Sequence, residues 1–342
     1  MTQENEKDSI ELDVKPDFDT PLLENRQDFC AYQSPQLSSF MALRKKSGQK
    51  GTINNKPVEL FNDGNYQLQL DYDKLRCGLN INTNKFLLFV LKKTSRQIPS
   101  KTPLEDINSI DRTIIIKQKE IKEFFGIKDK KHAKDIMISS SQILLHSNHT
   151  FTFTRYNKKQ ISCETGFNMT ILDKYDYRNG VVKLQFSDNF LRYIPQQYIA
   201  QYPNNIGQYS DTAYQITRYI CELYRIQQIK KRENCVLISI EKLLEKTNTI
   251  PTICELNDSN DRHYNREIVE PLDRAIDEIE SYGYFKSIYY CNLKSKPLTG
   301  EQLKCGEYMK YKNFKTLSVI FIFHEYDKSQ VNESIKKQKL FK

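Results

Sequence analysis

Apolar residues recur at three- and four-residue steps through positions 261–282, and this spacing predicts a long amphipathic helix. Its first turn is basic and polar instead, as in a helix that presents contacts to the major groove of DNA. An ordinary core helix with solvated charges is the alternative interpretation. The expected buried stripe is Tyr264, Ile268, Leu272, Ala275, Ile276 and Ile279. The candidate DNA contacts of the first turn are Arg262, His263, Asn265 and Arg266.

Two strand patterns, at 284–290 and 317–323, follow this helix, and two further helices are expected before it, at 211–231 and 240–246. Helix, helix, long helix and hairpin is the order of a winged helix. We therefore predict a second winged-helix DNA-binding domain over residues 201–328. Lysines between the two strands are candidate phosphate contacts: Lys294, Lys296, Lys310 and Lys312. Pro271 either kinks the long helix or marks the start of a shorter one.

A similar order of elements is expected in the first half of the chain. A strand near 66–72 and an apolar helix near 84–96 precede a strand at 112–117. A helix ending at Gly126 and a second helix with a basic start follow, and strands at 151–156, 160–172 and 181–186 are expected to supply the wing and the sheet. These patterns predict a first winged-helix domain over residues 66–200. Its candidate DNA contacts are Lys128, Lys130, Lys131 and Lys134. The apolar helix carries more apolar surface than a small domain needs, which suggests a dimer interface.

The two ends of the chain are polar and show little periodicity. Residues 1–65 are predicted to be largely disordered, and residues 329–342 to form a basic C-terminal tail. The formal net charge is +9, but residues 1–29 carry nine acids and three bases, so the remainder carries about +15. Such an excess favours a polyanionic partner such as nucleic acid. The predicted fold class is α+β, with two tandem winged-helix domains and a disordered N-terminal segment.

Several classes of protein are disfavoured by the sequence. It contains no apolar run long enough to span a membrane and no secretory signal pattern at its N-terminus. The eight cysteines are scattered without CxxC spacing, so reduced thiols, a cytoplasmic location and no structural metal are expected. No phosphate-binding GxxxxGK[ST] motif, nucleophile motif or cofactor-binding pattern is present. The chain is therefore expected to be a binding protein without a cofactor and not an enzyme.

A rolling-circle replication nuclease is the enzymatic alternative. Such an enzyme nicks DNA with a tyrosine beside a metal, and Tyr198 and Tyr202 have a suitable spacing. However, His146 and His149 are separated by two residues and cannot project from one face of a strand. With 21 tyrosines in the chain, the spacing of one pair carries little weight.

Residues 180–282 resemble the initiator replication proteins of iteron plasmids, the RepA/RepE/Pi class (Rep_3 type). The likeness lies in GVVKLQFSDNFLRYI, YSDTAYQITRYICELYRI, ISIEKLLEKT and YNREIVEPLDRAIDEI. In the last of these segments, Arg266 matches a basic residue of the family signature and Pro271 its proline. Asn265 falls where a lysine is common. Glu267 departs from the family, which usually has a second base at that position.

The resemblance implies two winged helices and a plasmid replication initiator that binds double-stranded DNA with direct repeats (iterons) at an origin. It also implies a monomer and a homodimer with different roles, melting of the origin by several bound copies, and recruitment of the host initiator and replicative helicase. The abundance of Lys, Asn, Ile and Tyr is typical of AT-rich codons and suggests a bacterial source. A winged-helix transcription regulator, which normally has one such unit, is the second alternative.

Overall fold

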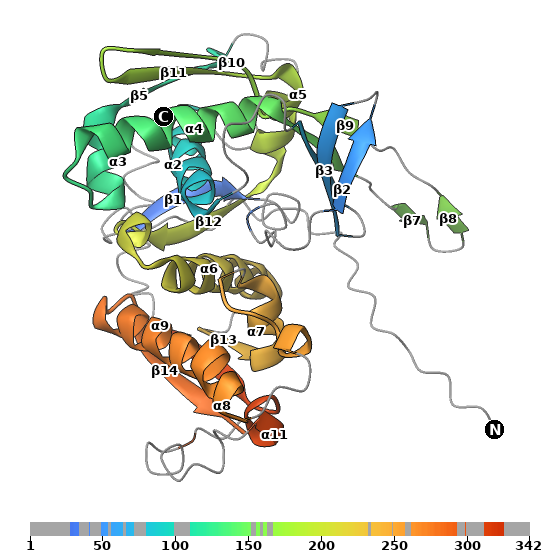
Figure 1. The fold of residues 1–342 in the computed structure, drawn as a ribbon, viewed down its shortest axis with the longest axis vertical. Coiled ribbons are helices and arrows are strands. Elements are labelled where there is room, and N and C mark those ends of the chain that lie inside the picture. Colours follow the sequence, from blue (N-terminus) through green and yellow to red (C-terminus); the bar gives the residue numbers. More distant parts are fainter. Residues whose placement is uncertain are drawn as a thin grey trace, which may run out of the picture.

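The structure is a computed structural model of the chain, and it mixes helices with antiparallel sheets (Figure 1). The α+β class predicted from the sequence is confirmed. The residues that the structure describes are 28–33, 41, 49–53, 56–63, 66–71, 80–98, 110–151, 155–157, 160–162, 167–231, 234–247, 249–256, 261–292, 298 and 311–324.

The first unit has six elements around a three-stranded antiparallel sheet. They are α2 (Ile81–Gln97), β5 (Thr113–Lys117), α3 (Gln118–Phe125), α4 (Lys130–His146), β10 (Leu172–Arg178) and β11 (Val181–Phe186). The strand order is β10-β11-β5, so the last strand lies in the centre of the sheet. The expected helices and the strands at 112–117 and 181–186 are found within one or two residues, except that α2 begins three residues before the expected position 84.

The second unit repeats this order. Its elements are α6 (Asp211–Lys231), β13 (Cys235–Ser239), α7 (Ile240–Lys246), α8 (Asp261–Tyr264), the π-helical turn η6 (Asn265–Val269), α9 (Glu270–Ser281), β14 (Phe285–Cys291) and β15 (Ser318–Phe323). The strand order β13-β15-β14 again places the last strand in the centre. The short helices η5 (Ile253–Leu256) and α11 (Tyr311–Phe314) lie in the connections. Both units therefore have the helix–strand–helix–helix–strand–strand order expected of a winged helix.

Local sequence explains where the elements of the first unit end. Gly126 ends α3 with a φ of 67°, a left-handed conformation that glycine adopts without a Cβ penalty. Asp129 then caps α4, and its carboxylate accepts the backbone N–H of Lys131 at 2.9 Å. Asn179 and Gly180 have positive φ values of 49° and 76°, which suits the two-residue turn between β10 and β11.

A five-stranded sheet stands beside the first unit, and the sequence did not predict it. Its order is β2-β3-β4-β6-β9, with β2 (Gln49–Ile53), β3 (Lys56–Asp63), β4 (Tyr66–Asp71), β6 (Ser147–Phe151) and β9 (Phe167–Met169). The short strands β7 (Arg155–Asn157) and β8 (Gln160–Ser162) pair with each other. The strands expected at 151–156 and 160–172 therefore do not form the wing. The wing is the β10–β11 hairpin alone among the described elements.

The strand β1 (Asp28–Gln33) pairs with β12 (Tyr198–Pro203) and packs against α2. Ala31, Tyr32 and Gln33 are fully buried. With β2 and β3, this strand corrects the expectation of disorder for those parts of residues 1–65. The other residues of 1–65, and the whole predicted tail at 329–342, lie outside the described residues.

The apolar helix α2 is covered by the chain itself. Every residue from Phe86 to Leu91 is at most 5% exposed. Helix α4 packs on α2 together with β1, whose burial against α2 could not be foreseen from a polar N-terminal segment. The excess apolar surface that suggested a dimer interface is therefore absent, and the structure removes that reason for expecting a dimer.

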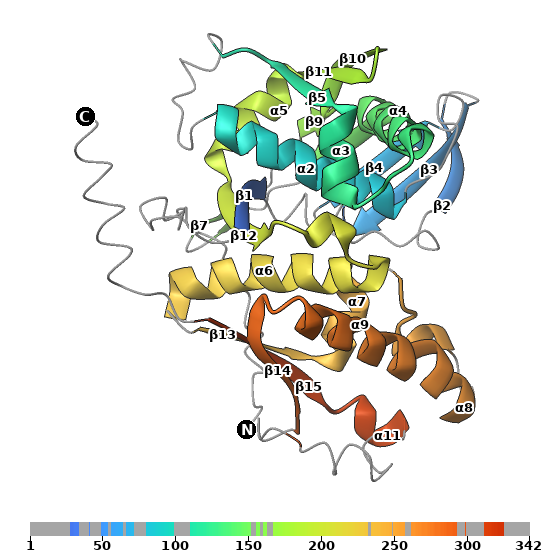
Figure 2. The same cartoon turned by 90° about the vertical axis from the view of Figure 1, so that its left-hand side faces the viewer.

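Helix α6 is the part of the second unit that faces the first, with α2 and the first unit on one side and α9 with its sheet on the other (Figure 2). Residues 213–222 are all buried, so this helix has no solvent face over nearly three turns. The short elements α5 (Asp188–Tyr193), η3 (Ile194–Gln196) and η4 (Ile206–Gln208) connect the first unit to α6. Among the described residues, no helix is long and apolar enough to cross a membrane.

Candidate nucleic-acid interface

The start of the long helix in the second unit separates polar from apolar side chains as the sequence predicted. His263, Asn265 and Arg266 are exposed, while Tyr264 is 1% exposed and packs edge-on against Phe314. The expected stripe of six apolar residues is buried in full. Arg262 lies in α8, but its side chain is outside the described residues. The polar first turn of this helix is thus presented to solvent.

Pro271 accounts for the irregular start of this helix. Proline has no backbone N–H, and its ring collides with the carbonyl group four residues earlier in a regular α-helix. The chain responds with a π-helical turn over Asn265–Val269, in which the N–H of Glu270 donates to the carbonyl of Asn265. Regular α-helix then resumes at Glu270, with Pro271 in the first turn of α9. Of the two expectations for Pro271, the start of a shorter helix is confirmed.

A partly buried polar contact anchors α9 to its sheet. The hydroxyl of Tyr290, on β14, donates to the carboxylate of Asp273, on α9. Burial raises the pKa of the Asp273 carboxyl, and the hydrogen bond from Tyr290 opposes this shift. Burial, followed by the nearby charge of Asp273, also raises the pKa of Tyr290. The contact fixes the rotation of α9 on the sheet and hence the direction in which its first turn points.

The one arginine of this turn with a described side chain is paired with its neighbour. Arg266 donates from Nε and from a terminal nitrogen to Glu267 Oε1, at 3.0 Å and 2.8 Å. Both side chains remain substantially exposed, at 68% and 42%, so the pair contributes little to stability. The pair does hold the guanidinium away from other acceptors. Glu267, where the sequence departs from the iteron-initiator pattern, therefore occupies the guanidinium group of Arg266 that another anion would need.

Replacing Glu267 by glutamine should raise the affinity for random duplex DNA several-fold and steepen its salt dependence by up to about 1 in log–log slope, because Arg266 is then released for phosphate. Titration of a labelled random duplex at several salt concentrations measures both quantities. Glu270→Gln removes the same charge from the same helix without releasing an arginine, and it should have a smaller effect. If the double variant Arg266→Ala/Glu267→Gln retains the full gain, Arg266 is not responsible for it.

In the first unit, the exposed basic residues gather where three elements meet. Gln118, the first residue of α3, donates its backbone N–H to Gly180 in the hairpin turn at 2.8 Å. Its side-chain amide donates to the carbonyl of Lys130, the first residue of α4. These bonds hold the start of α4 and the tip of the β10–β11 hairpin together at one end of the unit (Figure 1).

We call the basic residues at this place the basic corner: Lys117, Lys128, Lys130, Lys131, Lys134 and Arg178. All six are exposed. Lys117 and Arg178 both face Val181 across the sheet, and Lys134 lies over the ring of Tyr177 at 5.6 Å. Asp176 pairs with Arg178 at 2.9 Å and partly offsets its charge. The structure therefore places the four lysines predicted from the sequence on a common surface with a hairpin tip.

Two members of the basic corner, Lys117 and Arg178, were missed by the sequence reasoning. The sequence did carry a signal for both residues, because each stands at the end of a strand. Arg178 immediately precedes the Asn-Gly turn, and Lys117 immediately precedes the first residue of α3. Among the predicted contacts of the second unit, Lys294, Lys296 and Lys310 lie outside the described residues. Lys312 lies in α11, and its side chain is likewise not described. Their assignment as phosphate contacts stays a prediction.

The tyrosine pair considered for a nicking reaction lies on β12. Tyr202 is fully buried, and its hydroxyl donates to Glu222 Oε1 at 3.3 Å. In this conformation its phenol oxygen is not accessible to a DNA phosphate. The side chain of Tyr198 is outside the described residues. Across the described part of the chain, no three His, Cys, Asp or Glu side chains come together as metal ligands.

Comparison with known proteins finds a distant likeness in fold. The chain matches no protein-family model. No curated protein matches it in sequence. It is similar to the crystal structure of RctB domains 2-3 (RctB-155-483), with a TM-score of 0.43 and 10% identity over 86% of this chain and 95% of that chain. It is also similar to the selenomethionine derivative of RctB domains 2 and 3, with a TM-score of 0.41 and 12% identity over 87% and 95%. TM-scores this low carry no functional inference at such identities.

Proposed function

We propose that the chain is a replication initiator that binds double-stranded DNA, with direct repeats at a plasmid origin as its target. One observation carries the proposal: the same six-element unit occurs twice, and each copy exposes a polar or basic start of its third helix. A major groove about 12 Å wide admits such a helix. Two copies in one chain suit a target longer than a single groove segment.

Both units offer a helix start that suits a groove, but the side chains around the two helix starts differ. Among the described residues, the five lysines of the basic corner have no acidic partner within ion-pair distance, so they suit the phosphates beside a groove that the start of α4 enters, and they contribute affinity. The start of the long helix in the second unit offers His263, Asn265 and Arg266, whose guanidinium is held by Glu267. This set suits hydrogen bonds to base edges. In this proposal, several bound copies melt the origin and recruit the host initiator and helicase, as the sequence resemblance implies.

Removing Lys130 and Lys131 together should lower the affinity for duplex DNA and reduce the log–log salt slope by about 2, because each lysine lost is one phosphate contact fewer. The loss should be nearly equal for a selected target and for random duplex. Gel-shift titrations at several salt concentrations measure the slope. Lys286→Ala, an exposed lysine on the sheet of the second unit, serves as the control and should leave the slope unchanged. An unaltered slope in the double variant would remove the basic corner from the interface.

The origin assignment has its own experiment. Duplexes selected from a random pool by the purified chain give its target sequence, and footprinting on the DNA that flanks its gene locates that target. Protection of tandem direct repeats supports the initiator. Protection of one palindrome instead supports a transcription regulator. A supercoiled plasmid with this flanking DNA should stay closed in the presence of Mn²⁺, and a nicked product with protein on its 5′ end would overturn the proposal in favour of a nuclease.

A further inference from the structure

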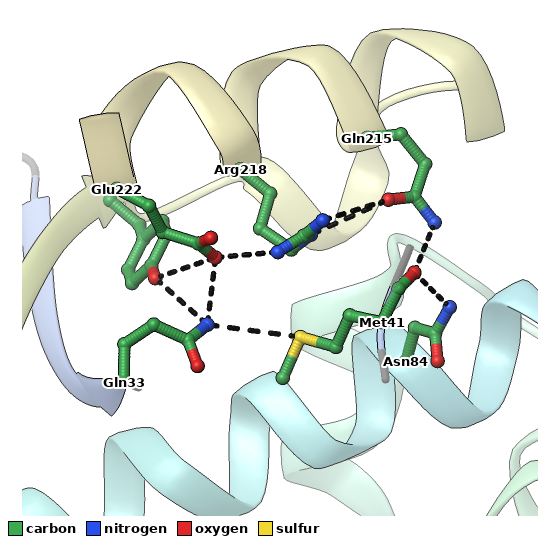
Figure 3. A network of polar contacts seen from close by, with 7 residues as sticks. Gln33, Met41, Asn84, Gln215, Arg218 and Glu222 are labelled. Atoms are coloured by element: carbon green, nitrogen blue, oxygen red, sulfur yellow. Dashed lines mark hydrogen bonds and ion pairs between the residues drawn. The ribbon is translucent and has the colours of Figure 1, made fainter. Parts of the chain in front are cut away.

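A buried ion pair lies on α6, between the two units (Figure 3). Arg218 donates from a terminal nitrogen to Glu222 Oε1 at 2.6 Å, and the two side chains are 0% and 2% exposed. The spacing of four residues is common on solvated helix surfaces. Here the pair is enclosed because α6 is covered on both sides. Neither charge can be stabilised by water, so both depend on the groups around them.

Those groups come from segments far apart in the sequence. Gln33, on β1, donates its amide to Glu222 Oε1 at 2.7 Å, and Tyr202, on β12, donates to the same oxygen at 3.3 Å. On the other side of Arg218, the carbonyl oxygen of Gln215 accepts from the guanidinium at 3.3 Å and 3.4 Å. The second unit's first helix is thereby bonded to both strands of the separate β1–β12 sheet.

The contacts continue to the first helix of the first unit. The amide of Gln215 donates to the carbonyl of Met41 at 3.1 Å, and the amide of Asn84, on α2, donates to the same carbonyl at 2.9 Å. Lys85, also on α2, donates to the carbonyl of Tyr209 at 2.7 Å, just before α6 begins. The chain of polar contacts therefore joins α2 and α6, the equivalent helices of the two units.

The connection between the units is equally close. Gln208 donates its amide to the carbonyl of Glu123, at the end of α3, at 3.1 Å. A Cβ on Gly207 would lie 2.4 Å from the carbonyl oxygen of Phe124, so only glycine fits there. On the other side, the N–H of Ser210 donates to Glu278, on α9, at 2.7 Å. The connection thus contacts both α3, which leads into α4, and α9, which continues from α8.

Directional polar contacts in a closed interface select one arrangement. Apolar surfaces of similar shape can slide or rotate against each other at little cost, whereas a buried ion pair tolerates few geometries. A buried pair also adds little net stability compared with apolar residues of similar volume. Its effect is therefore expected on the relative position of the two units more than on whether they fold.

We propose that Arg218 and Glu222 are positioning residues that fix the distance and rotation between the two DNA-reading helices, so that the chain recognises a composite target with one spacing between its halves. This inference rests on the proposed function, because it requires both units to bind the same duplex. Two linked DNA-binding units gain affinity only where their geometry lets both contact the duplex at the same time. A rigid junction therefore converts spacing into specificity.

The test uses the double variant Arg218→Met/Glu222→Leu, which leaves the net charge unchanged and no charge unpaired. Wild type and variant each select duplexes from a random pool, and binding is then measured on the wild-type target with 0, 1, 2, 5 or 10 base pairs inserted between its halves. Five base pairs turn the second half by about half a helical turn. Wild type should lose about 100-fold in affinity on that duplex, and the variant less than about 10-fold relative to its own best spacing.

Matched controls separate this role from a general effect on folding or binding. Lys119→Met/Glu123→Leu removes an exposed ion pair with the same four-residue spacing, on α3, and should keep the wild-type spacing preference. Two further duplexes each hold one half of the target alone. Equal affinity of variant and wild type for each of them shows that the DNA-binding surface of each unit is intact. The inference is overturned if the variant keeps the 100-fold preference for one spacing. It is also overturned if the target sequence that wild type selects contains only one half. If wild type selects no sequence at all, the proposed function itself fails.

Discussion

The free energy of unfolding should fall by about 3–5 kcal/mol when Glu222 is replaced by glutamine. The substitution keeps the size of the side chain, but it removes the carboxylate that pairs with the fully buried guanidinium of Arg218. The 2.6 Å contact between them would persist as a bond to a neutral amide, which offsets only part of the cost of burying the charge. The loss in free energy of unfolding arises because the charge of Arg218 stays buried, and not because the Arg218–Glu222 ion pair is itself strong.

Urea titration followed by circular dichroism measures this loss. Glu123→Gln breaks the exposed pair on α3 and should change the stability by less than about 1 kcal/mol, because solvent screens that pair. The double variant Arg218→Met/Glu222→Leu should recover most of the stability that Glu222→Gln loses. If Glu222→Gln and Glu123→Gln lower the free energy of unfolding by the same amount, water solvates the charge on Arg218. The enclosure of α6 is then incorrect.

Truncating Tyr32 to alanine should cost a similar amount, about 3–5 kcal/mol, because a large buried side chain is lost from β1. Tyr32 is fully buried, and its hydroxyl donates to the carbonyl of Ile98 at 2.8 Å. Its ring helps to cover α2, so the cavity would open in the centre of the first unit. Tyr32→Phe removes only the hydrogen bond and should cost about 0.5–1.5 kcal/mol, plus the penalty for an unsatisfied carbonyl.

The same urea titrations apply, with Tyr289→Ala as the control. Tyr289 is a tyrosine on β14 with 43% of its surface exposed, so its truncation should change stability by less than about 1 kcal/mol. A Tyr32→Ala protein as stable as wild type would show that the N-terminal strand is dispensable. It would also mean that β1 does not cover the apolar surface of α2 in solution. That surface would again be an argument for a dimer.

The regular elements of both units could be predicted because their signals are local. The stripe from Tyr264 to Ile279, the cap residues before α4 and α7, and the Asn-Gly turn each require only a few neighbouring residues. The four lysines near the start of α4 were found by the same reasoning. They follow a glycine turn, where the start of a second helix is expected.

What the sequence could not show depends on contacts between distant segments. β1 is a short strand in an otherwise polar segment, its partner lies on β12, and no local pattern reveals such pairing. The sequence predicts a helix over 211–231, but a helical pattern does not reveal what covers it. The four-residue spacing of Arg218 and Glu222 is typical of surface pairs. Only the placement of α6 between two units turns an ordinary surface pattern into a buried contact.

The pairing of β1 with β12 has a consequence for how the chain is made. Gln33 pairs with Tyr198 and Asp28 with Pro203, positions that are 165 and 175 residues further along the chain. At a synthesis rate of roughly 5–20 residues per second, β1 leaves the ribosome roughly 8–35 s before its partner strand does. During that interval α2 is already present and lacks the paired strand that covers it. The nascent chain therefore carries an unprotected apolar helix for many seconds, at the stage when chaperones act.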